Sequence, residues 1–176
     1  MYTGALVVLD ASVLIVLAKI RRLDLVRLTY GGAAVGPFVF EEVVTAGRRI
    51  GALGVECVEQ AIESGWLRVV RPVAEERRQT SQILRTSRLH EGEAQAIAIA
   101  CRRKLLVALD DKEARSMAVA LGLDIVGTAG LVLEARLRGH LELDDLEETL
   151  SHLSRTIWIS PEVVAGILKI ARKGRA

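Results

Sequence analysis

A chain of 176 residues with 51% hydrophobic side chains is long enough for one domain with a sizeable core, and no linker marks a second one. The net charge of +2 argues against binding nucleic acid through bulk charge, and 3% aromatic residues argue against base stacking as the main binding mode. Asp10 and Ser12 interrupt the apolar stretches near the N-terminus, which have no basic lead-in. We therefore expect a cytoplasmic protein without a signal peptide or a membrane span.

The first predicted element is a strand over residues 6–9, a continuous apolar run typical of a central parallel strand covered on both faces. Asp10 ends this run, and a helix is predicted from Val13 to Ile20. Asp10 or Ser12 is then the N-cap of that helix, or Asp10 is a functional carboxylate at the carboxyl edge of an α/β sheet. Taken alone, the stretch favours the cap, because caps are far commoner than sites.

The following segments continue the alternation of helices and strands. Gly31 and Gly32 end a second helix, Pro37 suits the first turn of the next one, and Gly65 closes another. Helices are predicted at residues 23–30, 37–47, 53–64 and 74–88, with strands at residues 33–35 and 66–70.

The second half of the chain repeats the order of strand, acid and helix. An Ala- and Ile-rich helix at 91–101, expected to be buried on most sides, leads into a strand at 105–109 that ends in Asp110. Further helices are predicted at residues 110–121, 127–138, 144–153 and 161–172, with strands at 123–126 and, at a sheet edge, 156–159. Helices between such short strands indicate right-handed crossovers and a mainly parallel sheet.

Asp110 stands between a buried strand and a helix, as Asp10 does. The carboxyl ends of parallel strands meet at one edge of a sheet, so both acids are expected at the same edge. The alternative for Asp110 is a capping box, in which Asp110 caps the next helix and Glu113 completes the box. That alternative leaves the presence of Asp111 unexplained.

Glu93 falls on the same helical stripe as Ile97 and Ala100, which is the stripe expected to be buried. A carboxylate there costs free energy unless a cation or a hydrogen-bond donor meets it. The alternative is a position in the first turn, where the helix dipole favours an anion. The sequence pattern leaves both interpretations open.

Glu41 and Glu42 follow apolar residues on the helix that begins at Pro37. On an ideal helical wheel, both glutamates lie about 130° from the centre of the apolar face. The wheel therefore does not choose between them.

Carboxylates drawn from several segments to one edge repel each other unless a divalent cation neutralises them. Hard oxygen ligands suit Mg²⁺ or Mn²⁺, and such a site can activate a water for attack on a phosphodiester. Zinc is disfavoured, because His90, His140 and His152 are scattered and are expected to be surface or capping residues. Cys57 and Cys101 lack metal-type or disulfide-framework spacing and are expected to be buried and reduced.

The acids stand in segments whose order resembles the PIN domain family, the metal-dependent ribonuclease fold found among VapC-type toxins. Those segments are VLDASVLI (8–15), PFVFEEV (37–43), HEGEAQAIA (90–98), LDDKEAR (109–115) and GTAG (127–130). Each segment alone is weak evidence for the family, whereas the five segments in this order are fairly specific for it. The Gly-Glu-Ala and Asp-Asp-Lys forms, with ISPE at 159–162, resemble a poorly characterised branch of the family rather than the shorter toxins.

The resemblance implies a three-layer α/β/α sandwich with a mainly parallel central sheet. It also implies a single domain over residues 1–176, with residues 142–176 as a C-terminal helical extension packed on it. Two positions depart from the family pattern. The third acid, commonly Asp, is Glu93, and Thr128 stands where an additional Asp is common.

The resemblance further implies a pocket of four acids for Mg²⁺ or Mn²⁺, and it favours Glu42 over Glu41. Its predicted metal-binding and catalytic residues are Asp10, Glu42, Glu93 and Asp110, supported by Ser12, Asp111 and Thr128 as cofactor-binding residues around them.

The function that follows is a ribonuclease, with the toxin of a toxin–antitoxin pair as one implied role. The partners implied are the RNA substrate, further copies of the chain in a homodimer or higher oligomer, and a small antitoxin protein. The alternative from a different class is a non-catalytic module that keeps the fold and serves in nucleic-acid binding or regulation. Metal titration together with a cleavage assay separates the two.

Overall fold

The computed structural model describes residues 6–173, so the first five and last three positions of the predicted domain lie outside the described residues. Its centre is a five-stranded sheet in which every neighbouring pair is parallel, in the order β3-β2-β1-β4-β5. The strands are β1 (Val7–Leu9), β2 (Ala33–Val35), β3 (Leu67–Val69), β4 (Leu106–Ala108) and β5 (Ile125–Val126). The predicted mainly parallel sheet is confirmed.

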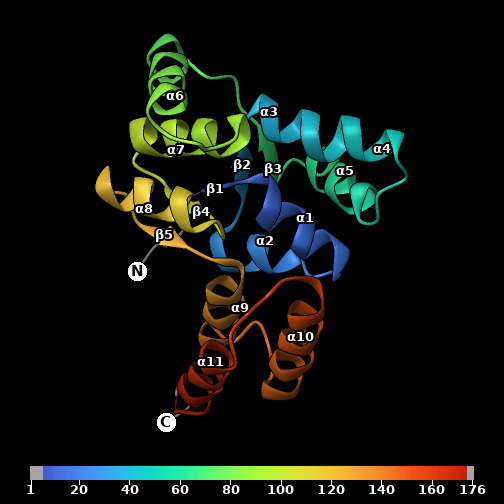
Figure 1. Cartoon of the computed structure of the whole chain (residues 1–176). Coiled ribbons are helices and arrows are strands. Elements are labelled where there is room, and N and C mark those ends of the chain that lie inside the picture. The colour runs from blue at the N-terminus through green and yellow to red at the C-terminus, as the bar shows by residue number, and fades with distance from the viewer. Residues whose placement is uncertain (1–5, 174–176) are drawn as a thin grey trace.

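Two hydrophobic cores lie on opposite faces of this sheet, because successive strand residues point to opposite sides. Val7 and Leu9 belong to one core, and Val8 belongs to the other. The first core is covered by α1 (Ala11–Lys19), α2 (Asp24–Tyr30), α5 (Val55–Glu63) and α9 (Thr128–Leu137). The second is covered by α7 (Glu91–Arg103) and α8 (Lys112–Ala120), with α6 (Ala74–Thr86) packed against α7. These layers confirm the predicted three-layer sandwich (Figure 1).

The predicted helix that begins at Pro37 is continuous but changes its winding. It starts as α3 (Pro37–Phe40), becomes the π-helix η1 (Glu41–Ala46), and finishes as α4 (Gly47–Arg49). Pro37 occupies the first helical turn, where its missing N–H costs nothing. Both glutamates that the wheel could not separate therefore lie in a π-helical turn.

The C-terminal helices α10 (Leu143–Thr156) and α11 (Pro161–Lys173) pack against α9 and against each other. Figure 1 shows these three helices at the end of the molecule away from α6 and α7. The predicted edge strand at 156–159 is wrong. Leu150 and Leu153 bury the apolar stripe of α10, and the helix continues to Thr156, where the Ile157 N–H donates to the Leu153 carbonyl at 2.8 Å.

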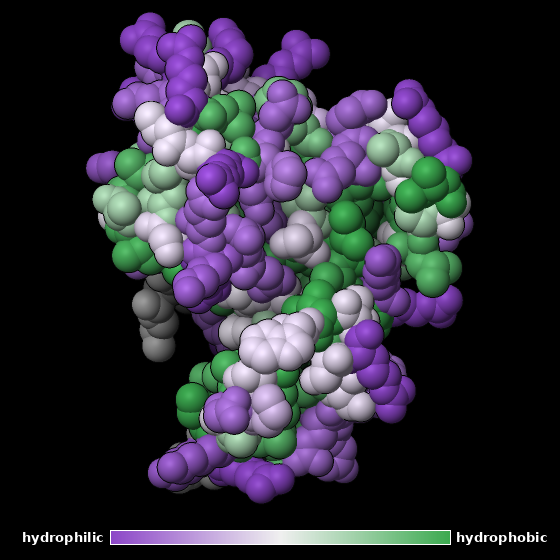
Figure 2. Space-filling model, in the orientation of Figure 1, coloured by the Kyte–Doolittle hydropathy of each residue, from purple (hydrophilic) through white to green (hydrophobic). Residues whose placement is uncertain are grey.

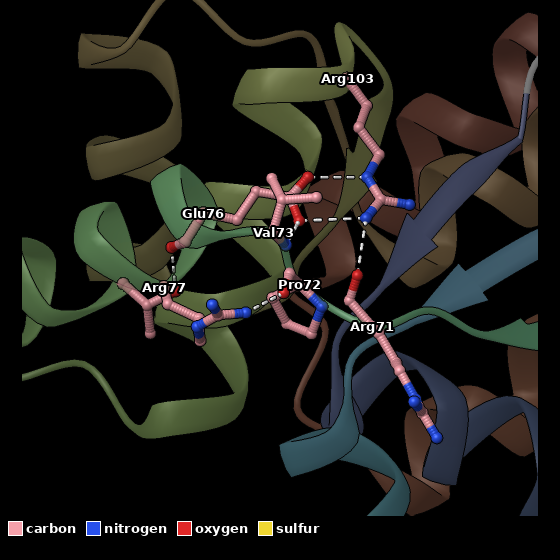
Figure 3. A network of polar contacts seen from close by, with 7 residues as sticks. Arg71, Pro72, Val73, Glu76, Arg77 and Arg103 are labelled. Carbon is pink, nitrogen blue, oxygen red and sulfur yellow. Dashed lines mark hydrogen bonds and ion pairs between the residues drawn. The ribbon is translucent and has the colours of Figure 1, made fainter.

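An ion pair between a buried glutamate and a partly exposed arginine joins α6 to α7 (Figure 3). The Arg103 guanidinium donates to both oxygens of Glu76, at 2.7 and 3.0 Å, and also to the Arg71 carbonyl at 3.2 Å. The Val73 backbone N–H donates to the same carboxylate at 2.8 Å. Glu76 is 1% exposed, so these donors replace the water that the carboxylate has lost.

Among residues 6–173, no helix is long and apolar enough to cross a membrane. Cys57 and Cys101 are free thiols, and both are half-buried rather than fully buried as predicted.

Candidate metal site at the carboxyl edge of the sheet

The predicted acids Asp10 and Asp110 follow two neighbouring strands, β1 and β4. Leu9 pairs with Ala108, and the Asp10 N–H donates to the Ala108 carbonyl at 3.3 Å. The chain then leaves β1 for one face of the sheet through α1, and leaves β4 for the other face through α8. Ligands of open α/β sheets bind in the crevice at such a switch point. The structure therefore brings these two acids together where a ligand is expected.

Asp10 is both the helix cap and a buried acid. Its Oδ1 accepts a hydrogen bond from the Val13 N–H at 2.9 Å, which caps α1, and the Ser12 hydroxyl donates to Oδ2 at 2.9 Å. The side chain is only 1% exposed. The pKa of Asp10 is raised to about 7, chiefly by burial and to a smaller extent by the nearby carboxylates of Asp110 and Glu93, although the two hydrogen bonds lower it.

Asp110 does not cap the helix that follows it, so the alternative of a capping box formed by Asp110 and Glu113 is wrong. Asp111 is the N-cap of α8, and its Oδ1 accepts from the Ala114 N–H at 2.9 Å. Asp110 instead turns towards α9, where the Thr128 N–H and hydroxyl donate to its two oxygens at 2.8 and 2.5 Å. Glu113 accepts from the Arg88 N–H at 3.0 Å. The cap thus belongs to Asp111, and Asp110 is held at the edge of the sheet by Thr128.

Glu93 combines both interpretations that the pattern left open. It is half-buried, and it lies near enough to Asp10 to raise the pKa of that acid. Its Oε2 also accepts from the His90 N–H at 2.9 Å, in the first turn of α7. The carboxylate therefore supports its own helix while it lies near Asp10.

Glu42 approaches the same turn of α7 from η1. Its Oε2 lies 3.6 Å from the position that a Cβ of Gly92 would occupy. Glu41 and Glu42 are both exposed and line one cavity of about 410 Å³ together with His90 and Glu91. The structure places Glu42 beside the first turn of α7 without separating the two neighbouring glutamates by burial.

Gln95 links α7 to the start of α3, and it was not identified from the sequence. Its Oε1 accepts from the Phe38 N–H at 3.1 Å, and the side chain is 5% exposed. A Cβ at Gly36 would lie 2.1 Å from that oxygen, so glycine leaves room for the contact. The sequence did contain a signal, because Gln95 is an amide among the Ala and Ile residues of a helix that was predicted to be buried. A buried polar group normally has a hydrogen-bond partner, so Gln95 could have been expected to contact another element.

The chemistry of these donors fits a hard divalent cation. Asp10, Glu93 and Asp110 offer oxygen atoms only, and both charged groups that shift the pKa of Asp10 are themselves carboxylates. A cation would relieve this repulsion. In the described part of the chain, no group of three His, Cys, Asp or Glu side chains is already arranged to hold a metal ion. Glu93 and Asp110 are held by backbone and Thr128 donors instead.

Replacing Thr128 by valine should weaken the site without unfolding the protein. The side chain is 0% exposed, and valine would keep its shape while removing the hydroxyl that orients Asp110. Loss of such a supporting hydrogen bond typically lowers metal affinity or activity by about 10- to 100-fold. Titration with Mn²⁺ by calorimetry measures the effect.

The matched control for this substitution is Thr29→Val. Thr29 is 3% exposed, and its hydroxyl has no hydrogen-bond partner among the described residues. Removing that hydroxyl should leave Mn²⁺ binding unchanged. Equal losses of affinity in both variants would contradict a specific role for Thr128.

A larger cavity than the one lined by Glu41 and Glu42 lies away from these acids. It has a volume of about 730 Å³ and is lined by residues of α1, α2 and α5, including Ala18, Arg27 and Gln60. Ala18 is close to the C-terminal end of α1, whereas Asp10 caps the N-terminal end. We place the candidate site by its chemistry rather than by the size of the cavity, because the edge of the sheet brings the buried carboxylate of Asp10, with its strongly raised pKa, close to two further carboxylates.

Comparison with known proteins supports one family. A family model described as a PIN domain matches residues 6–173, which is nearly the whole chain. No curated protein shows significant similarity to the chain.

Proposed function

Because this chain belongs to the PIN domain family, a nuclease-type fold that generally uses divalent metal ions, we propose that it is a Mg²⁺- or Mn²⁺-dependent endoribonuclease. The observation that carries this proposal is the buried carboxylate of Asp10, whose pKa is raised to about 7 beside Asp110 and Glu93 at the switch point. Strongly perturbed acids in such a crevice are typical of functional sites.

We assign three of the acids, Asp10, Asp110 and Glu93, by their positions around this crevice, and Glu42 by the family resemblance. Asp10 and Asp110 anchor the cation from the ends of β1 and β4, while Glu93 and Glu42 complete the pocket from α7 and η1. A cation held there would supply neutralisation of the carboxylates, a lowered pKa for a coordinated water and polarisation of the phosphodiester.

The protein's own residues hold the acids in place. Ser12 and the Val13 N–H fix the Asp10 carboxylate, and Thr128 fixes that of Asp110. Asp111 supports the site through its cap at the start of α8. Ligands held in this way lose little conformational entropy when a cation binds.

The test is cleavage of a labelled single-stranded RNA by protein stripped of metal with EDTA. We expect no cleavage until Mg²⁺ or Mn²⁺ is added, and calorimetry should detect binding of the same ion. A chain that neither binds the ion nor cleaves RNA would instead be the non-catalytic nucleic-acid-binding or regulatory module.

The two glutamates of η1 should differ in their effect on cleavage. Glu42→Gln should reduce it by at least about 10-fold, because Glu42 approaches the first turn of α7, which carries Glu93. Glu41→Gln removes the same charge one residue earlier and should leave the rate near that of the wild type. Single-turnover cleavage in Mn²⁺ measures both, and a larger loss in Glu41→Gln would reverse the assignment.

The family membership also supports proposals about domain organisation and partners. We propose a single domain in which α10 and α11 form the C-terminal extension, self-association into a homodimer or higher oligomer, and a role as a toxin held by a small antitoxin protein. Light scattering tests self-association. Growth arrest on expression of the wild type, absent with Asp10→Asn, tests the toxin role.

A further inference from the structure

A second cavity adjoins the candidate metal site on its α8 side. It has a volume of about 600 Å³ and is bordered by Asp110 at the sheet edge. Its other lining residues include Lys112, Arg115, Ser116, Val119 and Ile125. Figure 2 shows hydrophilic side chains gathered in the middle of this face, over the region where Figure 1 places the start of α8 beside α7. A ligand at the carboxylates can therefore extend along α8.

Arg115 faces Asp110 across Gly127. A Cβ at Gly127 would lie 3.0 Å from Arg115 Nη1 and 3.1 Å from Asp110 Oδ1, so both groups flank the same point. Gly127 has ordinary extended backbone angles, with φ −99° and ψ 169°, and needs no glycine for its conformation. The missing side chain instead keeps the space between the guanidinium and the carboxylate free.

The two cations of this cavity form no ion pair within the described residues. Arg115 is half-buried and donates one hydrogen bond, from Nη1 to the Leu109 carbonyl at 3.0 Å, while Lys112 is exposed. The guanidinium keeps further donors, which in arginine match the oxygens of a phosphate group. The neighbouring carboxylates repel a phosphodiester, and these two cations supply opposite charge beside them.

Part of the lining of this cavity is apolar. Val119 is 58% exposed and Ile125 is half-buried, so both present hydrocarbon to a ligand. Such a surface accepts a ribose or a base without reading its hydrogen-bonding edge. Cations next to an apolar surface are complementary to the alternating phosphate and sugar groups of single-stranded RNA.

We propose that Lys112 and Arg115 form a phosphate-binding subsite for the RNA strand next to the scissile bond, with Val119 and Ile125 packing against the adjoining nucleotide. This inference rests on the proposed ribonuclease function. It adds, on α8, a site that positions the RNA strand beside the carboxylates that hold the metal.

The competing explanation for Arg115 is structural, because its bond to the Leu109 carbonyl also fixes the end of β4. The salt dependence of binding separates the two roles, since it counts phosphate contacts and is insensitive to the stability of the fold. Each contact with a single strand contributes about 0.7 to the slope of log K against log salt concentration.

The experiment measures fluorescence anisotropy of a short fluorescein-labelled single-stranded RNA with the full chain in EDTA, over a series of salt concentrations. Arg115→Met and Lys112→Met should each reduce the slope by about 0.7 and weaken binding about five-fold at about 0.1 M salt. Arg115→Lys should keep the wild-type slope. Arg27→Met, which removes an exposed cation beside the distant large cavity, should change neither quantity.

Unchanged slopes in Arg115→Met and Lys112→Met would overturn the subsite, even if the melting temperature falls. Absence of binding by the wild type at low salt would overturn it as well. Cleavage assays on the same proteins keep the two proposals distinct. Reduced slopes without metal-dependent cleavage would support the subsite and reject the nuclease, whereas cleavage with unchanged slopes would do the reverse.

Discussion

Asp10→Asn should abolish metal-dependent cleavage and, in the absence of metal, make the fold more stable at pH 8. Asparagine keeps an oxygen that accepts the Val13 N–H bond, but it carries no charge to bind a cation. Removal of a direct ligand should lower activity by more than about 100-fold, because loss of a supporting contact alone costs about 10- to 100-fold.

The gain in stability follows from the raised pKa of Asp10. The folded pKa of about 7 lies above the ordinary value of 3.8, so the folded state holds the proton more tightly. The acid therefore contributes most to stability below pH 3.8, and this contribution is lost as the pH rises to about 7. The loss at pH 8 is at most about 4 kcal/mol, which is the ceiling for the gain in Asp10→Asn.

Chemical denaturation in EDTA at pH 4 and pH 8 measures this difference. The two proteins should have similar stability at pH 4, and the variant should be the more stable one at pH 8. Asp144→Asn, which neutralises an exposed acid in the first turn of α10, should cleave normally and gain no stability. A variant that is less stable than the wild type at pH 8 would contradict the unfavourable burial of Asp10.

Arg103→Met should destabilise the protein by about 3 kcal/mol, because it leaves the Glu76 carboxylate buried with one remaining donor, the Val73 N–H. Substitution of the other partner, Glu76→Gln, should lower the free energy of unfolding by only about 1 kcal/mol. The Arg103 side chain is 32% exposed and stays hydrated when its partner loses charge, whereas that of Glu76 is 2% exposed. Urea denaturation of both variants at neutral pH tests this asymmetry.

Lowering the pH should reduce the difference in stability between the wild type and Arg103→Met. Burial raises the pKa of Glu76, but the hydrogen bonds from Arg103 and Val73 outweigh it and hold the pKa below the ordinary value of 4.5. The ionised pair therefore contributes its stability above pH 4.5, and the contribution is lost as the pH falls through the lowered pKa. Arg102→Met, which removes a neighbouring charge without these hydrogen bonds, should change stability by less than about 0.5 kcal/mol.

The sheet and the place of two acids were predictable because they depend on short-range patterns. Apolar runs that end at Asp10 and Asp110 identified two buried strands, and the parallel topology then required both acids at one edge. The apolar stripe of α7 likewise indicated an inward position for Glu93, as one of the two interpretations that the pattern left open. These inferences use only the side-chain period of strands and helices.

The remaining details depend on contacts between distant residues. Asp110 and Asp111 are equivalent as caps in the sequence, and only the donors of Thr128 at the start of α9 draw Asp110 away. Glu41 and Glu42 could not be separated on an ideal wheel, and η1 follows a different period there. Their assignment still rests on the family resemblance and awaits the paired substitutions.

Because β1 and its neighbour β4 are far apart along the chain, the parts of the candidate site leave the ribosome at different times. Ribosomes release β1, β2 and β3 first, while Asp110 and Thr128 are still to be added. If the four acids form the catalytic centre, an incomplete nascent chain has no complete centre, and RNA near the ribosome is spared until most of the protein has emerged. The long-range pairing of β1 with β4 also makes assembly of this centre a late and comparatively slow event.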